Sequence, residues 1–204
     1  MKIAIEGGHG YNTPGKRSPD NSFYEWNFNR EIAIGIVCRL IALGYDAELT
    51  VPEQEDISLQ ERCNRVNKLC NLLGTENVIF LSVHANAAGN GSSWMSARGW
   101  ECYTTPGNTK SDTLATCLYN SAENIFQGMK IRKDMSDGDP DKEACFYVIK
   151  NTKCPAVLTE NFFYDNKEDL AFLQSDEGKK KIIEVHVRGI IDYIEMKEKK
   201  EGGN

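Results

Sequence analysis

The chain has 204 residues, which is room for one domain of ordinary size. Hydrophobic residues make up 40% of it and charged residues 26%, a balance that excludes disordered and fibrous proteins and predicts a buried core. With 24 basic and 30 acidic residues the formal net charge is −6, so no net positive field is available to hold a phosphate backbone. We therefore expect no nucleic-acid partner.

The apolar runs are too short to cross a membrane. Residues 32–37 and 78–83 are among the longest, far short of the roughly 20 residues that span a bilayer, so we expect no membrane insertion. The N-terminus enters the apolar residues 3–5 directly, without the features of a secretory signal. This predicts a chain made in the cytoplasm without a signal of its own, or one whose signal has been removed.

Seven cysteines are present, an odd number with no CxxC pair among them. The sequence therefore predicts neither a disulfide framework nor a cysteine zinc site. Cys63 and Cys70 fall in a helical pattern that also carries Val66 and Leu73, so we expect both thiols to be reduced and buried in the core.

The first half of the chain alternates strand and helix patterns. The predicted strands cover residues 2–6, 45–51 and 78–83, and the predicted helices run from Ser22 to Leu43 and from Ser58 to Leu73. Ser22 with Glu25 is a capping-box pattern, as is Ser58 with Glu61. The run 78–83 is almost entirely apolar, as expected of a central strand that is covered on both faces.

The second half has longer polar segments between its elements. Strands are predicted at 99–105, 145–149 and 156–159, a helix at 112–126, and a last helix capped by Ser175 that runs through Ile194. The polar segment 85–98 is long for a loop within a domain, which is typical of a functional loop. Alternating strands and helices predict one α/β domain over residues 1–196, followed by a charged, disordered tail over 197–204.

Chemistry-bearing residues follow three of the predicted strands, where ligands of open α/β sheets bind. They lie in Glu6-Gly7-Gly8-His9-Gly10, Ser82-Val83-His84-Ala85-Asn86 and Leu158-Thr159-Glu160-Asn161. Glu25 opens the first helix. Two imidazoles and one carboxylate are a ligand set for catalytic zinc, and a second carboxylate outside that set can accept a proton.

Other roles remain open for the first two of these residues. His9 sits in a glycine-rich turn, a type of turn that can bind phosphate, although the spacing of Gly8, Gly10 and Thr13 does not fit GxGxxG. Glu25 can be explained by capping alone, because it completes the box that begins at Ser22.

The remaining candidates also have structural explanations. His84 can be a structural histidine at a strand end, and Glu160 can be an ion-pair partner, although an acid that ends a buried strand is unusual unless it is paired. The third histidine, His186, lies among apolar residues of the last helix, and we expect it on the surface or in the core rather than at a metal.

Together these residues resemble the zinc-dependent N-acetylmuramoyl-L-alanine amidases of the amidase-3 type. The matching pieces are Gly8-His9-Gly10, Glu25, Ser82-Val83-His84-Ala85-Asn86 and Pro155-Ala156-Val157-Leu158-Thr159-Glu160. Weaker matches extend the resemblance from about residue 2 to residue 194. Glu6 and Gly7 depart from it, since the family often has aspartate and proline there.

The resemblance implies a fold and a mechanism. The fold is a single three-layer α/β domain with a mixed, mostly parallel sheet of about six strands flanked by helices. One Zn2+ per chain is held by His9, Glu25 and His84, and Glu160 is the catalytic carboxylate. The substrate is the peptidoglycan amide between N-acetylmuramic acid and L-alanine of the stem peptide.

Further expectations concern substrate contacts and setting. Asn86 and Trp94 are expected to contact the substrate, whereas Trp100 is expected to pack in the core. The segments 89–98 and 132–143 are expected to line the cleft. The enzyme is expected to be a monomer that acts on the cell wall, as an endolysin released from the cytoplasm or as a secreted enzyme.

Three alternatives stay open. The domain can be a zinc peptidase or deacetylase that acts on another amide, or a catalytically silent module that binds peptidoglycan. A nucleotide-binding α/β domain is a third alternative, weakened by the poor glycine pattern.

Overall fold

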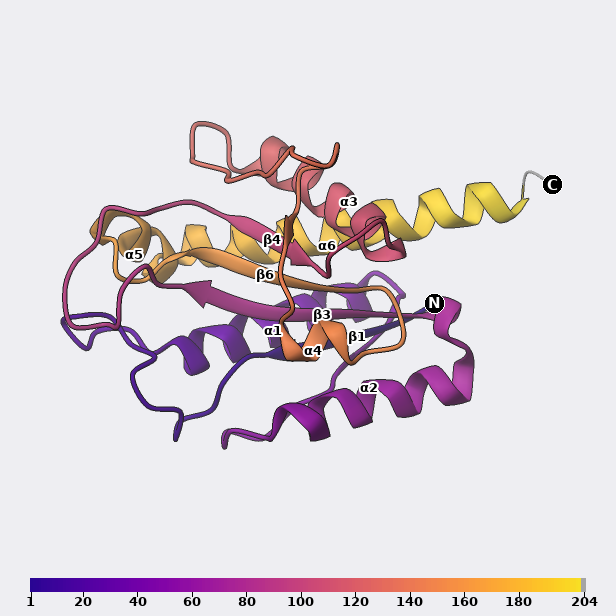
Figure 1. Ribbon diagram of the computed structural model, residues 1–204, viewed down its shortest axis with the longest axis horizontal. Coiled ribbons are helices and arrows are strands. Elements are labelled where there is room, and N and C mark those ends of the chain that lie inside the picture. Colours follow the sequence, from indigo (N-terminus) through magenta and orange to yellow (C-terminus); the bar gives the residue numbers. More distant parts are fainter. Residues whose placement is uncertain (203–204) are drawn as a thin grey trace.

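A six-stranded sheet runs through the middle of the molecule, in the order β2-β1-β3-β6-β4-β5 (Figure 1). The computed structural model describes residues 1–202. The strands are β1 (Lys2–Gly7), β2 (Asp46–Leu49), β3 (Val78–Asn86), β4 (Glu101–Thr104), β5 (Lys142–Glu143) and β6 (Ala156–Phe163). All neighbouring strands are parallel except β4 and β6, which are antiparallel. The mixed, mostly parallel sheet is therefore confirmed.

Helices cover both faces of this sheet. They are α1 (Glu25–Ala42), α2 (Leu59–Leu73), α3 (Lys110–Ile125), α4 (Tyr147–Lys150), α5 (Lys167–Gln174) and α6 (Asp176–Gly202), with a 3₁₀ turn, η1 (Thr75–Asn77), after α2. Helices α1, α3 and α6 share one core cluster, and α2 and α4 share the other. In β1, Ile3 and Ile5 enter the first cluster while Ala4 enters the second, as alternation along a strand requires. The predicted three-layer α/β fold is confirmed.

The predicted capping box at Ser22 is wrong. Helix α1 begins at Glu25, and its N-cap Tyr24 makes no side-chain cap. The Ser22 hydroxyl and amide instead donate to Asp20 Oδ1 at 2.8 and 3.0 Å, in a turn that precedes the helix. Glu25 is thereby free of a capping role.

The predicted strand at 145–149 is also wrong. Residues 147–150 form helix α4, and the edge strand β5 lies earlier, at Lys142–Glu143. Val148 and Ile149 are consecutive and both enter the cluster beneath α2, whereas a strand would send them to opposite faces. A short apolar run does not by itself distinguish these two conformations.

Residues 197–202 are helical, within the segment 197–204 for which the sequence predicted a disordered tail. Helix α6 continues through Gly202, and residues 203–204 lie outside the described residues. No helix within residues 1–202 is long and apolar enough to cross a membrane. All seven cysteines are free thiols, and the predicted burial of Cys63 and Cys70 is confirmed.

A buried ion pair links the end of β1 to α2. Arg62 and Glu6 are each only 1% exposed, and Arg62 Nη1 lies 3.1 Å from Glu6 Oε2. The Ser82 hydroxyl donates to the other Glu6 oxygen at 2.9 Å. Arg62 also donates to the carbonyl oxygens of Gly7 and His9, both at 3.2 Å. This guanidinium therefore fixes the chain where it leaves β1.

We predict that Arg62→Ala lowers the free energy of unfolding by about 3–5 kcal/mol, because it leaves the Glu6 carboxylate buried and unpaired. Arg65→Ala is the matched control on the same helix, since its pair with Glu53 is partly exposed, and it should cost at most about 1 kcal/mol. Chemical denaturation followed by circular dichroism measures both. Equal losses in the two variants would contradict this account of the buried pair.

Candidate metal centre and active-site cleft

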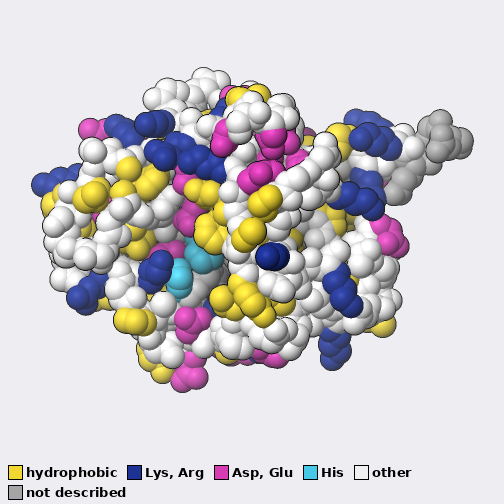
Figure 2. All heavy atoms as spheres, viewed as in Figure 1, with side chains coloured by type: hydrophobic (Ala, Val, Ile, Leu, Met, Phe, Trp, Pro, Cys, Tyr) yellow, Lys and Arg dark blue, Asp and Glu magenta, His cyan; other side chains and the backbone are white. Residues whose placement is uncertain are grey.

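A cleft of about 440 Å3 lies beyond the carboxyl ends of β1, β3 and β6. The space-filling view shows the histidines at the bottom of a hollow in this face (Figure 2). Its lining residues are His9, Pro14, Gly15, Lys16, Glu25, His84, Ala85, Asn86, Ala87, Gly89, Asn90, Phe146, Leu158, Glu160 and Tyr164. Five of the six predicted site residues are among them, and Trp94 is not.

The turn after β1 brings His9 over the end of β3. His9 has a φ of 65°, in the left-handed region that non-glycine residues rarely adopt. The preceding Gly8 lies directly against the His84 ring, and a Cβ at this position would come within 1.9 Å of His84 Cε1. Only glycine therefore permits this close approach of backbone and imidazole.

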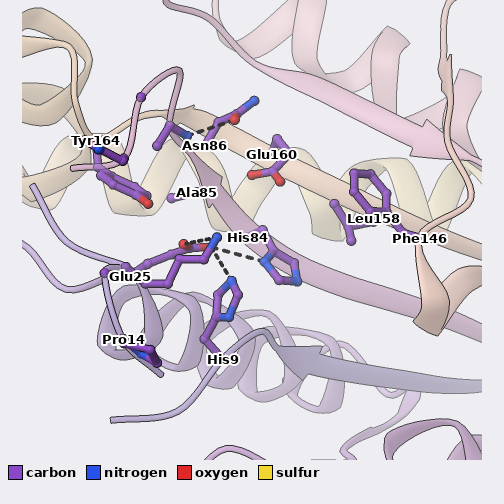
Figure 3. Close-up of a pocket in the computed structure, with 15 residues that line it drawn as sticks. His9, Pro14, Glu25, His84, Ala85, Asn86, Phe146, Leu158, Glu160 and Tyr164 are labelled. Atoms are coloured by element: carbon purple, nitrogen blue, oxygen red, sulfur yellow. Dashed lines mark hydrogen bonds and ion pairs between the residues drawn. The ribbon is translucent and has the colours of Figure 1, made fainter. Parts of the chain in front are cut away.

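Glu25 lies between the two imidazoles. Its Oε1 is 3.1 Å from His84 Nδ1 and 3.3 Å from His9 Nε2. The two rings are perpendicular, with their centroids 5.0 Å apart. Figure 3 shows all three side chains converging, from α1, from β3 and from the turn after β1.

These three residues can hold a metal ion. One ligand atom from each lies within 4.8 Å of the others. Glu25 is 1% exposed, yet its Oε2 has no hydrogen-bond partner, as expected of a buried carboxylate oxygen that faces a cation. Two imidazoles and a carboxylate also match the donors of catalytic zinc sites, which keep a further position open.

The protonation states favour metal binding. Burial alone would raise the pKa of Glu25, but its hydrogen bonds to His84 and His9 lower that pKa below its usual value. Burial lowers the pKa of His84, against the opposing effect of Glu25. Both shifts favour the forms that bind metal, a charged carboxylate and a neutral imidazole.

Glu160 lies across the cleft from this group. In the sheet it pairs with His84 on β3 and with Glu101 on β4. The close-up view shows its carboxyl group facing the cavity (Figure 3). Its Oε2 is buried without a hydrogen-bond partner. Burial and the charges of Glu25 and Glu101 raise the pKa of Glu160 well above its ordinary value.

The two predicted substrate contacts lie in different surroundings. Asn86 lines the cleft, and its amide group is held at both ends, donating to Glu101 at 2.7 Å and accepting from the Ala87 amide at 2.8 Å. Trp94 packs at the edge of the core with Lys167 over its ring, 5.4 Å from the centroid. A contact between Trp94 and substrate stays a prediction.

The other aromatic and histidine predictions concern the core. Trp100 is fully buried and donates to Asn161 at 3.0 Å, which confirms the packing role. His186 is also fully buried, with Nε2 2.9 Å from the Thr159 hydroxyl and Nδ1 2.7 Å from a backbone carbonyl of its own helix. His186 is thus a core residue.

Sequence reasoning missed several residues of the cleft. Phe146 and Leu158 form apolar wall beside Glu160, and Tyr164 closes the other side (Figure 3). Lys16 lies 3.9 Å from Glu25 Oε2. Phe146 was hidden by the wrong strand assignment at 145–149, whereas the place of Lys16 in the long loop after β1 left no signal in the sequence.

The family model Amidase_3, described as N-acetylmuramoyl-L-alanine amidase, matches residues 3–192. The chain belongs to this amidase family. Members are generally zinc-dependent, in keeping with the His9, Glu25 and His84 group. The enzyme is thus an amide hydrolase of the N-acetylmuramoyl-L-alanine amidase type.

Relatives of the amidase cover nearly all of the chain. It is 27% identical to the endolysin of Bacillus phage SPP1, over 99% of the chain and 69% of the relative. It is 32% identical to N-acetylmuramoyl-L-alanine amidase LytC of Bacillus subtilis, over 94% of the chain but only 35% of that protein.

Solved structures share the fold. An N-acetylmuramoyl-L-alanine amidase from Clostridium difficile 630 superposes with a TM-score of 0.79 at 24% identity. The match covers 96% of the present chain and 97% of the Clostridium difficile chain. The catalytic domain of CwlV from Paenibacillus polymyxa superposes with a TM-score of 0.78 at 24% identity, over 96% and 99% of the two chains.

We predict that Glu25→Gln lowers zinc affinity at least tenfold, because the amide removes the negative charge shared by the two histidines. Glu31→Gln is the matched control, since Glu31 lies on the outer face of the same helix and pairs with Lys179. Competition with a fluorescent chelator measures both affinities. An unchanged zinc affinity in Glu25→Gln would show that Glu25 is not a metal ligand and has a structural role only.

Proposed function

We propose that the amidase hydrolyses the amide between N-acetylmuramic acid and L-alanine of the peptidoglycan stem peptide. One Zn2+ per chain is held by His9, Glu25 and His84. The observation that carries this proposal is the presence of two different features in one cleft: a three-residue ligand group, and Glu160, whose Oε2 is buried without a hydrogen-bond partner. A bound Zn2+ supplies Lewis-acid polarisation of the amide carbonyl and of the attacking water.

Glu160 acts as the general base and then as the general acid. Its carboxylate accepts a proton from the attacking water and delivers that proton to the amine of L-alanine as the amide bond breaks. A pKa raised by burial and by Glu25 and Glu101 makes the carboxylate a stronger proton acceptor, and the positive charge of a bound metal opposes this rise. The two effects together bring Glu160 toward the working range of an acid and base catalyst.

The cleft walls orient the substrate. Phe146 and Leu158 offer apolar surface beside Glu160, and Asn86 offers an amide group whose rotation is fixed by Glu101. Such a fixed polar group beside apolar walls suits a substrate that carries both sugar and peptide parts. Trp94 is proposed to contact substrate outside the cleft proper.

The setting follows from the same proposal. The enzyme works as a monomer on the cell wall, either as an endolysin, like the phage SPP1 relative, or as a secreted amidase. A binding module would have no use for a carboxylate oxygen that is buried without a hydrogen-bond partner, so Glu160 favours catalysis over silent binding. Cleavage of a different amide by the same zinc chemistry is distinguished by the mass of the product.

We predict that the Glu160→Gln variant keeps its zinc but that its kcat falls by a factor of about 10² to 10⁴. The substitution removes the group that accepts the proton but none of the metal ligands. Glu168→Gln is the control, since Glu168 lies on α5 and is exposed. Turnover of a purified muropeptide and the zinc content of each variant are measured together. Full activity in Glu160→Gln would exclude the proposed base.

A further inference from the structure

The segment between α3 and α4 carries an acidic loop that the amidase site does not use. In the sequence Asp137-Gly138-Asp139-Pro140-Asp141, three aspartates alternate with other residues. Figure 1 draws this segment beyond the edge of the sheet, and Figure 2 shows acidic side chains gathered in the same area. Local turns fold the loop back on itself, for example where the Asp134 amide donates to the Pro140 carbonyl at 3.2 Å.

Asp141 is buried within this loop without a full set of partners. It is 2% exposed, and its Oδ2 accepts a 2.5 Å hydrogen bond from the Thr104 hydroxyl. Its Oδ1 has no hydrogen-bond partner, and neither has the buried Oδ1 of Asp139. The Asp139 carboxyl lies close enough to raise the pKa of Asp141, so two buried carboxylate oxygens without a donor adjoin the Thr104 hydroxyl.

No basic side chain of the segment compensates this pair of acids. Arg132 and Lys142 both form ion pairs with Glu101, and Lys133 forms one with Glu123. Burial raises the pKa of Asp141 to about 7, the Thr104 hydrogen bond opposes this rise, and the Asp139 carboxyl adds to it. Two adjoining carboxyls at neutral pH need either a shared proton or a cation.

We propose that Asp139, Asp141 and Thr104 form part of a Ca2+ site, separate from the zinc ligands. The donors are all oxygens, which hard cations prefer, and nitrogen or sulfur donors that would select zinc are lacking among these three residues. Ca2+ accepts about six to eight oxygens in flexible geometry, including waters and backbone carbonyls, and so suits an irregular loop. Mg2+ requires a nearly ideal octahedron of ligands.

Such a site would fix the segment that holds Glu101, although none of the residues 132–143 lines the cleft itself. Arg132 and Lys142 flank the loop and hold the Glu101 carboxylate at 2.5 and 2.7 Å. Glu101 in turn fixes Asn86 in the cleft and pairs with Glu160 across the strands. Bound Ca2+ therefore stabilises the folded protein and keeps this chain of contacts in place.

The test is thermal unfolding of the zinc-loaded full chain near pH 7.5, with added Ca2+ or Mg2+ and with four proteins. These are the wild type, Asp141→Asn, Asp139→Asn and the control Asp192→Asn, which changes an exposed aspartate on α6. Millimolar Ca2+ should raise the Tm of the wild type and of Asp192→Asn by several degrees, because a ligand that binds only the folded state stabilises it.

The loop variants should lose this response. Without Ca2+, their Tm should equal or exceed that of the wild type, because each substitution removes repulsion between the two carboxyls. If Asp141→Asn fails to fold, Asp139→Asn gives the same test at a less buried position.

Three outcomes would overturn the proposal. The first is a wild-type Tm that does not respond to Ca2+ but changes with pH around 7, which would show a shared proton only. The second is an equal Ca2+ response in the wild type and in both loop variants. The third is an equal rise in Tm with Mg2+ at the same concentration, which would show a site for divalent cations in general and not one selective for Ca2+.

Discussion

The carboxylate of Glu25, buried between two imidazoles, is the interaction on which the active site depends. One oxygen is shared by His9 and His84, and the other is buried without a hydrogen-bond partner, 3.9 Å from Lys16 Nζ. A carboxylate in this position is costly for the fold unless positive charge reaches it. The burial that destabilises the metal-free protein therefore also makes this site bind a divalent cation strongly.

Much of the surrounding structure keeps this group in place. Asn29, one turn after Glu25, donates both to the Glu25 carboxylate at 3.3 Å and to the Gly8 carbonyl at 3.2 Å, which ties helix α1 to the turn after β1. On the other side of the sheet Arg62 holds the His9 carbonyl. The strand order then places β6 between β3 and β4, so that Glu160 faces the group from the neighbouring strand. Metal ligands and base thus come from separate elements that the sheet fixes relative to one another.

The sequence predicted the central strands because β1 and β3 contain short, mostly apolar runs that end in glycine or polar residues. The placement of His9 and His84 at neighbouring strand ends followed from that pattern. Glu25 was ambiguous, since the spacing from Ser22 imitates a capping box, and only the competing turn at Asp20 decides against it. The short run at 145–149 fits a helix as well as a strand, and packing beneath α2 selects the helix.

Other features depend on pairing between distant segments, which no local pattern records. The antiparallel placement of β4 beside β6 brings Glu101 next to Glu160 and within reach of Asn86. The buried charge of Glu101 is compensated by Arg132 and Lys142 from a segment whose sequence shows little periodicity. These contacts become visible only when the chain is folded.

The most direct measurement of the central claim is mass spectrometry of a purified muropeptide incubated with the protein, with and without a chelator. We expect the free disaccharide and an intact stem peptide that begins with L-alanine, no product after chelation, and recovery of both products when Zn2+ is restored. Cleavage within the stem peptide, or no product with Zn2+ present, would contradict it.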